Sequence, residues 1–182
     1  NNSGVQYRSR ELPNSNFGVG GYQCDLHPAA DYFGMLYEER GAGVVCKYGE
    51  FVARNAEGKK RVVGRIGKGK VRDLAPWYTF RVVCRGNLLQ HFVGDVPIAI
   101  IMDDKRNAPR KGIIALQVHA GPAMTVRFKN LKLTRFAPEE VAKLPPLVDV
   151  LLAREQALAN APGNSSGTGA VPQWIWDAKA GG

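Results

Sequence analysis

The sequence predicts an antiparallel β-sandwich or jelly roll, and three observations support this all-β fold class. Between residues 1 and 136, many short segments alternate apolar and polar side chains, as strands with one buried face do. Clusters of Gly, Asn, Asp and Pro separate these segments at fairly even spacing, which is typical of turns. No helical period lies between them, so the pattern favours stacked sheets over alternating strands and helices.

The expected strands follow in order from the N-terminal side. Segment 5–8 alternates, and so does 22–26 after the "GVGG" turn. Further strands are expected at 43–47, 51–54, 78–84, 88–93, 98–102, 113–119 and 125–133.

Two other segments follow the sandwich, which we place at residues 1–136. Pro138, followed by two glutamates, is a favourable helix start and predicts a short helical segment over 137–160. Residues 161–182 open with "APGNSSGTGAVP", which predicts a flexible linker. They close with "QWIWDAKAGG", whose aromatic alternation indicates the start of a further domain.

The chain is basic, with 25 Lys and Arg against 16 Asp and Glu, so its charge would suit a polyanion. Much of the excess lies in residues 57–73, where "GRIGKGKV" matches part of a phosphate-binding loop. Val71 stands where a hydroxyl should bind magnesium, so we expect an exposed hairpin with solvated lysines. No aromatic residue lies between Phe51 and Trp77 to stack on bases, so nucleic acid is not an expected partner.

Two protein classes are disfavoured by composition. No apolar run approaches the roughly 18 residues of a membrane-spanning helix, so no membrane span is expected. The cysteines, Cys24, Cys46 and Cys84, lack the paired spacing of a zinc or redox site. Each lies in a strand-like segment, which favours buried free thiols, and an odd count permits at most one internal disulfide.

The segment "GIIALQVHAGP", residues 112–122, places two polar side chains on one strand face, Gln117 and His119. Leu116 and Val118 alternate with them, so we expect these two to pack inward. The Ala-Gly-Pro that follows is expected to turn the chain into the last strand of the sheet.

One aspartate and another strand histidine complete the candidate groups. Asp25 shares a strand face with Gln23 in a segment that otherwise has the pattern of core. A lone strand histidine such as His91 usually has a structural role. Asp25, His91 and His119 could still converge on one sheet face, as a metal site or an acid–base pair.

Paired carboxylates are another device of sugar chemistry. Glu38 and Glu39 stand together before an arginine, and Asp103 and Asp104 stand together before a lysine. We expect these four to be solvated loop charges first and catalytic groups second.

Several phrases together resemble one family. They are "NSGVQYRSR", "GYQCDL", "YFGMLYEERGAG", "WYTFRVVCRGNLLQHFVGDV" and "GIIALQVHAGPAMTVRFKNLKL", in the order found in the 3-keto-disaccharide hydrolase domain family. The resemblance covers residues 1 to about 136 and implies a concanavalin A-like jelly roll. It also implies activity on glycosides oxidised at the sugar C3, by hydrolysis or by elimination. The ketone acidifies the hydrogen at C2, so a base removes it, the anomeric oxygen leaves, and water can add back.

The resemblance further implies a site. We expect Asp25, His91 and His119 to form the catalytic centre, with His119 as the first choice of base because the pKa of His lies near working pH. The same three residues could hold a divalent metal ion that stabilises the enolate. The expected sugar contacts are Arg8, Gln117, Tyr22 and Gln23.

Two departures from the family pattern matter. The opening strands that should precede "NSG" are absent, so the sandwich is expected to be incomplete on its N-terminal side. Gly94 and Asp95 also replace the usual Asn-Gly turn, a change that could move His91.

Two alternatives to an enzyme stay open. The domain could be a non-catalytic carbohydrate-binding module that holds glycan through Arg8, Gln117 and aromatics such as Tyr7 and Tyr22. It could also be a structural or assembly module, with the basic hairpin facing a neighbouring domain or chain. Because tandem domains of this type occur in large secreted bacterial proteins, the resemblance implies a secreted or periplasmic location in a multidomain protein.

Overall fold

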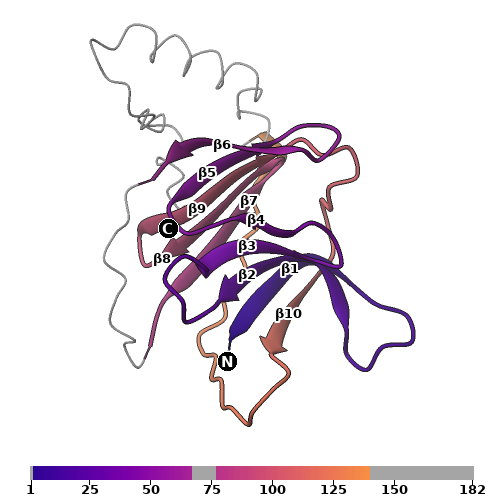
Figure 1. Cartoon of the computed structure of the whole chain (residues 1–182), viewed down its shortest axis with the longest axis vertical. Helices are drawn as coiled ribbons and strands as arrows, with labels where there is room; N and C mark the ends of the chain where they lie inside the picture. The colour runs from indigo at the N-terminus through magenta and orange to yellow at the C-terminus, as the bar shows by residue number, and fades with distance from the viewer. Residues whose placement is uncertain (1, 67–76, 140–182) are drawn as a thin grey trace, which may run out of the picture.

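Two stacked five-stranded sheets form the fold, a jelly-roll β-sandwich (Figure 1). The structure is a computed structural model that describes residues 2–66 and 77–139. The first sheet has the order β10–β1–β2–β3–β4, and all its neighbours are antiparallel. Its strands are β1 (Ser3–Glu11), β2 (Val19–Leu26), β3 (Phe33–Glu39), β4 (Gly43–Cys46) and β10 (Ile113–Val118).

The second sheet has the order β6–β5–β9–β8–β7. It is antiparallel except for β5 and β9, which run parallel, a pairing that the predicted antiparallel class did not include. Its strands are β5 (Glu50–Arg54), β6 (Lys60–Arg65), β7 (Phe80–Arg85), β8 (Leu88–Val93) and β9 (Val96–Asp103).

The core lies between the sheets because alternate side chains of each strand point inward. From the first sheet it receives Tyr7, Tyr22 and Leu36, which pack against Leu89 and Ile101 of the second. The cysteines are free thiols, as predicted, and Cys24 and Cys46 belong to this core. The intervening residues of β1 and β2, among them Gln6, Gln23 and Asp25, therefore face away from the second sheet.

Most expected strands are present, and three differences have physical reasons. Strand β3 was not predicted, because Gly34 and the two glutamates at its end break the apolar alternation. Gly34 adopts φ 74°, and a Cβ there would lie 1.9 Å from Ile98 Cδ1, so a larger residue requires Ile98 to move. Strand β6 falls in the basic segment, where charges hide the alternation. The predicted strand 125–133 forms no strand ladder.

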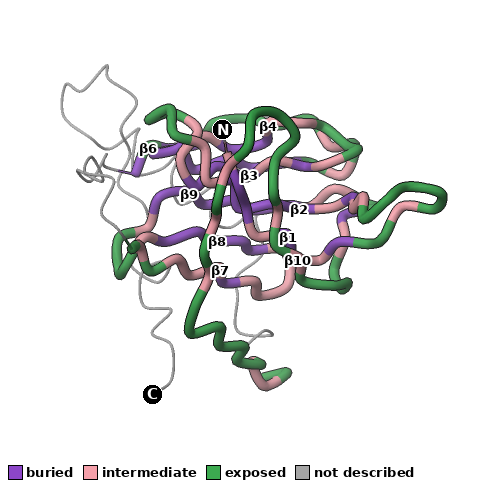
Figure 2. Tube along the Cα trace, turned by 90° about the horizontal axis from the view of Figure 1, so that it is seen from below, coloured by how far each residue is buried: buried purple, intermediate pink, exposed green. Residues whose placement is uncertain are grey.

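One end of the sandwich is open, at β10. Strands β3 and β4 pack over β5, β8 and β9. By contrast, β10 is largely exposed, as Figure 2 shows in green and pink. Leu116 and Val118 were expected to pack inward, but they are 42% and 70% exposed. The pairing of Leu116 with Val5 puts both side chains on the inner face of the sheet, as expected. Among the described residues, however, no apolar side chains of the second sheet cover them.

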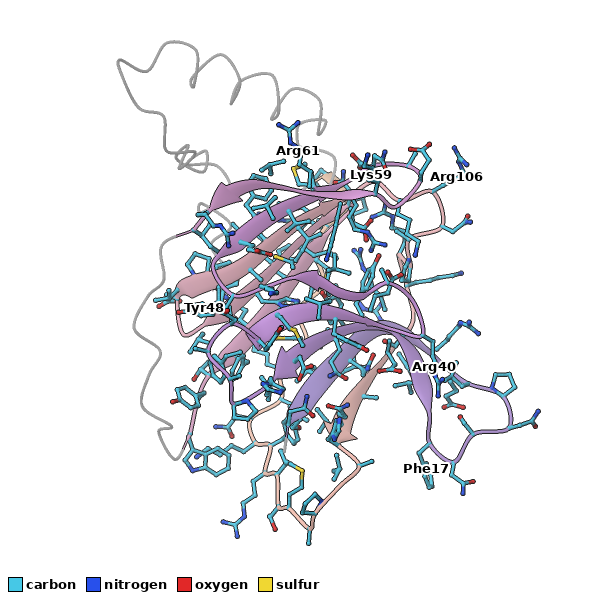
Figure 3. The ribbon with its side chains drawn as sticks, in the orientation of Figure 1. Phe17, Arg40, Tyr48, Lys59, Arg61 and Arg106 are labelled. Carbon is cyan, nitrogen blue, oxygen red and sulfur yellow. The ribbon has the colours of Figure 1, made fainter. Side chains whose placement is uncertain are left out.

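The basic segment forms an exposed hairpin as far as it is described. Strands β5 and β6 pair antiparallel, and Lys59 and Arg61 project from this hairpin (Figure 3). Of the predicted helical segment 137–160, only 137–139 are described; residues 161–182 lie outside the described residues. Within the described part of the chain, no helix has the length and apolar character needed to cross a membrane.

Candidate active site

A pocket of about 350 Å³ lies on the outer face of the first sheet, within the size range of small-molecule sites. One wall comes from strands β2 and β10. Gln23 and Asp25 of β2 line it, together with Gln117 of β10 and His119 just after that strand. Asn2, immediately before β1, completes this wall.

The opposite wall comes from β3 and the loop before it. Met35, Tyr37 and Glu39 stand at alternate positions of β3 and therefore share its outer face, with His27 and Tyr32 beside them. Met35 and Tyr37 were not among the sequence candidates, and Glu39 was considered only as one of the paired carboxylates. The period-2 spacing of these three residues would have placed them on one face if residues 33–39 had been recognised as a strand.

Asp25 is the most perturbed acid of the pocket. The side chain is 3% exposed, and its Oδ1 accepts a hydrogen bond from Asn2 Nδ2 at 3.0 Å. Burial raises the pKa of Asp25 to about 6, against the opposing effects of His119, a hydrogen bond from Gln23 and the backbone of Leu26. A carboxyl group with this pKa exchanges its proton near neutral pH, as a general acid or base must.

His119 stands beside Asp25, and its ring has a defined orientation. Its Nδ1 lies 2.5 Å from the carbonyl oxygen of Ala120. A carbonyl oxygen only accepts hydrogen bonds, so Nδ1 carries the hydrogen and donates it. In the neutral ring Nε2 then has a free lone pair and can accept a proton.

The predicted convergence of three groups holds for Asp25 and His119 and fails for His91. His91 lies on β8 of the second sheet and is 0% exposed. Its Nδ1 donates to the carbonyl oxygen of Gly34 at 2.8 Å, and its Nε2 lies 2.8 Å from Tyr7 Oη. Burial lowers the pKa of His91 to about 4, so the ring is neutral. It is a core histidine and does not reach the pocket.

Arg8 and Tyr22 are also placed away from the pocket. The register of β1 shifts between Gln6 and Ser9, and Arg8 in this bulge adopts φ 47°. Its Nη1 donates to the carbonyl oxygen of Gly86 at 2.9 Å, in the β7–β8 turn of the second sheet. Tyr22 is on the inner face and 0% exposed, and its hydroxyl donates to Asp103. Neither side chain lines the pocket as a sugar contact.

Two of the acids expected to be solvated are buried ion-pair partners instead. Arg54 Nη2 lies 2.9 Å from Glu38 Oε2, and its Nη1 lies 3.3 Å from Asp103 Oδ2. Lys105 Nζ adds a contact of 2.6 Å to Glu38 Oε1. This network joins the two sheets at one end of the core.

The metal site proposed for Asp25, His91 and His119 does not fit the geometry. His91 is in the core, and no group of three His, Cys, Asp or Glu side chains able to hold a metal ion occurs in residues 2–66 and 77–139. The pocket therefore provides one carboxyl, one imidazole and several amides, which suit proton transfer and hydrogen bonding.

Comparison with known proteins gives one match. The family model described as "3-keto-alpha-glucoside-1,2-lyase-like domain" matches residues 1–134 of the chain. No curated protein and no solved structure matches the chain. The matched range contains every strand of both sheets and every residue that lines the pocket.

Proposed function

The chain belongs to the 3-keto-alpha-glucoside-1,2-lyase-like domain family, and on that premise we propose that its pocket cleaves the anomeric bond of a 3-keto-glycoside. The observation that carries this proposal is the pair formed by Asp25 and His119. A base with a free lone pair and a carboxyl group with a pKa of about 6 line the same pocket.

In the proposed reaction, His119 Nε2 takes the hydrogen from C2 of the sugar. The electron pair of that C–H bond forms the enolate of the C3 ketone. The enolate then re-forms the ketone and expels the anomeric oxygen, which takes the proton of Asp25. The product is an unsaturated keto sugar, and addition of water at C1 converts elimination into net hydrolysis.

The first experiment asks whether turnover occurs and needs the ketone. We expect the protein to cleave a 3-keto-glucoside and to leave the parent glucoside, which carries a C3 hydroxyl, intact. His119→Ala should reduce kcat by about 100-fold or more. Phe17→Ala is the matched control, because Phe17 lies at the fully exposed tip of the β1–β2 loop (Figure 3).

The second experiment separates the two roles by the leaving group. A nitrophenolate leaves without a proton, whereas a sugar alkoxide needs one. Asp25→Asn should therefore impair cleavage of a 3-keto-disaccharide far more than that of a nitrophenyl 3-keto-glucoside, while His119→Ala impairs both. Equal losses on both substrates in Asp25→Asn would contradict the acid role of Asp25.

Binding without turnover is the competing outcome. If calorimetry shows that the wild type binds 3-keto-glucoside and no cleavage product forms, the domain is a carbohydrate-binding module. Loss of binding in His119→Ala would then still assign the ligand to this pocket, but the catalytic proposal would be wrong.

A further inference from the structure

Three glutamines from three different strands lie side by side on the outer face of the first sheet. Gln6 of β1 is paired with Gln23 of β2, and Gln117 of β10 is paired with Gly4 of β1. Gly4 leaves room for the Gln23 side chain to cross β1. A Cβ at Gly4 would lie 2.6 Å from Gln23 Cδ and 2.7 Å from its Nε2. The side chain of Gln23 thereby reaches Gln117.

Their side chains form a chain of hydrogen bonds that all run in one direction. Ser9 Oγ donates to Gln6 Oε1 at 2.8 Å, and Gln6 Nε2 donates to Gln23 Oε1 at 2.7 Å. Gln23 Nε2 then donates to Gln117 Oε1 at 3.1 Å. Gln6 and Gln23 are 2% and 1% exposed, so water does not compete for their amides.

Asp25 fixes the direction of this chain. Gln23 donates a hydrogen bond to Asp25. An oxygen of Asp25 accepts it when the carboxyl is ionised, and also when the other oxygen carries the proton meant for the leaving group. The nitrogen of the Gln23 amide therefore faces Asp25 and Gln117, and its oxygen faces Gln6. The reversed chain would place the Gln23 oxygen against this accepting oxygen of Asp25.

The consequence for Gln117 is that its amide oxygen faces Gln23 and accepts a hydrogen bond from it. Gln117 lines the pocket, and no hydrogen bond of its Nε2 to another residue is found in the part of the chain that the structure describes. The group that it offers to a ligand is thus an N–H donor. A ketone or enolate oxygen only accepts hydrogen bonds, so it can pair with this N–H. The hydrogen bond between them becomes stronger as negative charge develops on that oxygen in the enolate.

We infer that Gln6 is a positioning residue, which acts through Gln23 to keep the N–H of Gln117 directed at the ketone oxygen of the substrate. This inference rests on the proposed function for the identity of the ligand. Gln117 stabilises the enolate, and Gln6, Gly4 and Ser9 fix its orientation without touching the substrate.

The test compares Gln6→Met with Gln90→Met. Both replace a buried strand glutamine, but Gln90 lies on β8 of the second sheet, away from the pocket. Gln6→Met should lower kcat on a 3-keto-glucoside by about tenfold, in line with the loss of one oriented hydrogen bond. The KM should change less, and the pH profile should stay the same because Asp25 and His119 are intact. An unchanged kcat in Gln6→Met, or an equal loss in Gln90→Met, would overturn the inference.

A second variant covers the case in which Gln6→Met does not fold. Gly4→Ala leaves every amide in place but pushes Gln23 away, and Gly4 does not have the positive φ that strains an alanine. It should reproduce the kcat loss. The control is Gly20→Ala, whose nearest neighbour is the flexible end of Leu12 at 3.2 Å. Full activity in a folded Gly4→Ala protein would contradict the positioning role.

A binding measurement keeps the inference separate from turnover. A 3-keto C-glucoside has no leaving oxygen at C1, so its affinity reports only recognition of the ketone. We expect about tenfold weaker binding in Gln117→Glu, which replaces the donor with an acceptor, and in Gln6→Met. If the wild type binds this probe without cleaving 3-keto-glycosides, the catalytic proposal fails while the donor assignment stands. If both variants bind the probe as the wild type does, the donor assignment fails.

Discussion

Tyr7 and His91 join the two sheets through a hydrogen bond across the core, with 2.8 Å between Tyr7 Oη and His91 Nε2. The other ring nitrogen of His91 donates to Gly34, so Nε2 has the lone pair and the tyrosine hydroxyl donates to it. The two rings meet edge to face. A neutral imidazole is thus built into the core as a structural element.

This arrangement predicts a stability that falls in acid. The pKa of His91 is lowered in the folded protein from 6.5 to about 4, so the unfolded chain binds the proton first. The neutral His91 ring therefore contributes about 3 kcal/mol to the free energy of unfolding above about pH 6.5. This contribution is lost as the pH falls to about 4. The test uses Asp25→Asn as the background, because the ionisation of Asp25 gives a slope of the opposite sign in the same pH range. In that variant, urea denaturation should show a stability that rises with pH between about 4 and 6.5, and adding His91→Gln should remove the rise. A rise that survives in the double variant would contradict the assignment.

Asp25 should act in the opposite direction. Its folded pKa is raised from 3.8 to about 6, so its contribution is present below about pH 4 and lost as the pH rises through about 6. Asp25→Asn should therefore stabilise the fold by about 1–3 kcal/mol at pH 8 while impairing cleavage. Because the slopes of Asp25 and His91 oppose each other, each should become visible only in the variant that removes the other. A less stable Asp25→Asn protein at pH 8 would count against the burial cost.

The buried ion pairs of Arg54 give a third prediction. Replacing it by methionine leaves Glu38 and Asp103 buried without their guanidinium partner, so Arg54→Met should cost about 3–5 kcal/mol. Arg40→Met is the matched control, because Arg40 is 71% exposed beside Glu39 and should cost less than about 1 kcal/mol. Chemical denaturation measures both. Similar losses in the two variants would show that burial of the pairs is energetically unimportant.

Two glycines separate backbone strain from packing. Gly34 and Gly94 both have positive φ, at 74° and 57°, but a Cβ at Gly94 meets nothing within 4 Å, whereas one at Gly34 would overlap Ile98. Gly94→Ala should cost about 1–2 kcal/mol from strain alone. Gly34→Ala should cost at least about 2 kcal/mol more, because the core must also move. Equal melting temperatures would contradict this difference.

The alternation of side chains predicted much of the sheet and part of the pocket. It placed Gln23 and Asp25 on one face of β2, and Gln117 and His119 on one face of the segment 113–119, and the pocket contains all four. The same alternation puts Tyr22 on the opposite face from Gln23, so its position in the core was readable from the sequence.

The positions of His91 and Arg8 could not be predicted in this way. Periodicity tells which residues of a strand share a face, but it does not tell which sheet the strand joins. His91 belongs to the second sheet, and its polar partners are an inward-facing tyrosine and a carbonyl. Arg8 was misplaced because a single bulge changes the face of a side chain without leaving a mark in composition.

The exposed strand β10 connects ligand binding to local order. In the described part of the chain it is paired only with β1, yet it positions Gln117 directly and His119 at its end. Opening of this strand would dismantle the pocket while the core stayed folded, so binding competence and global unfolding are distinct equilibria. A sugar that bridges Asp25 and His119 binds only the closed form, and by mass action it should slow amide hydrogen exchange along β10.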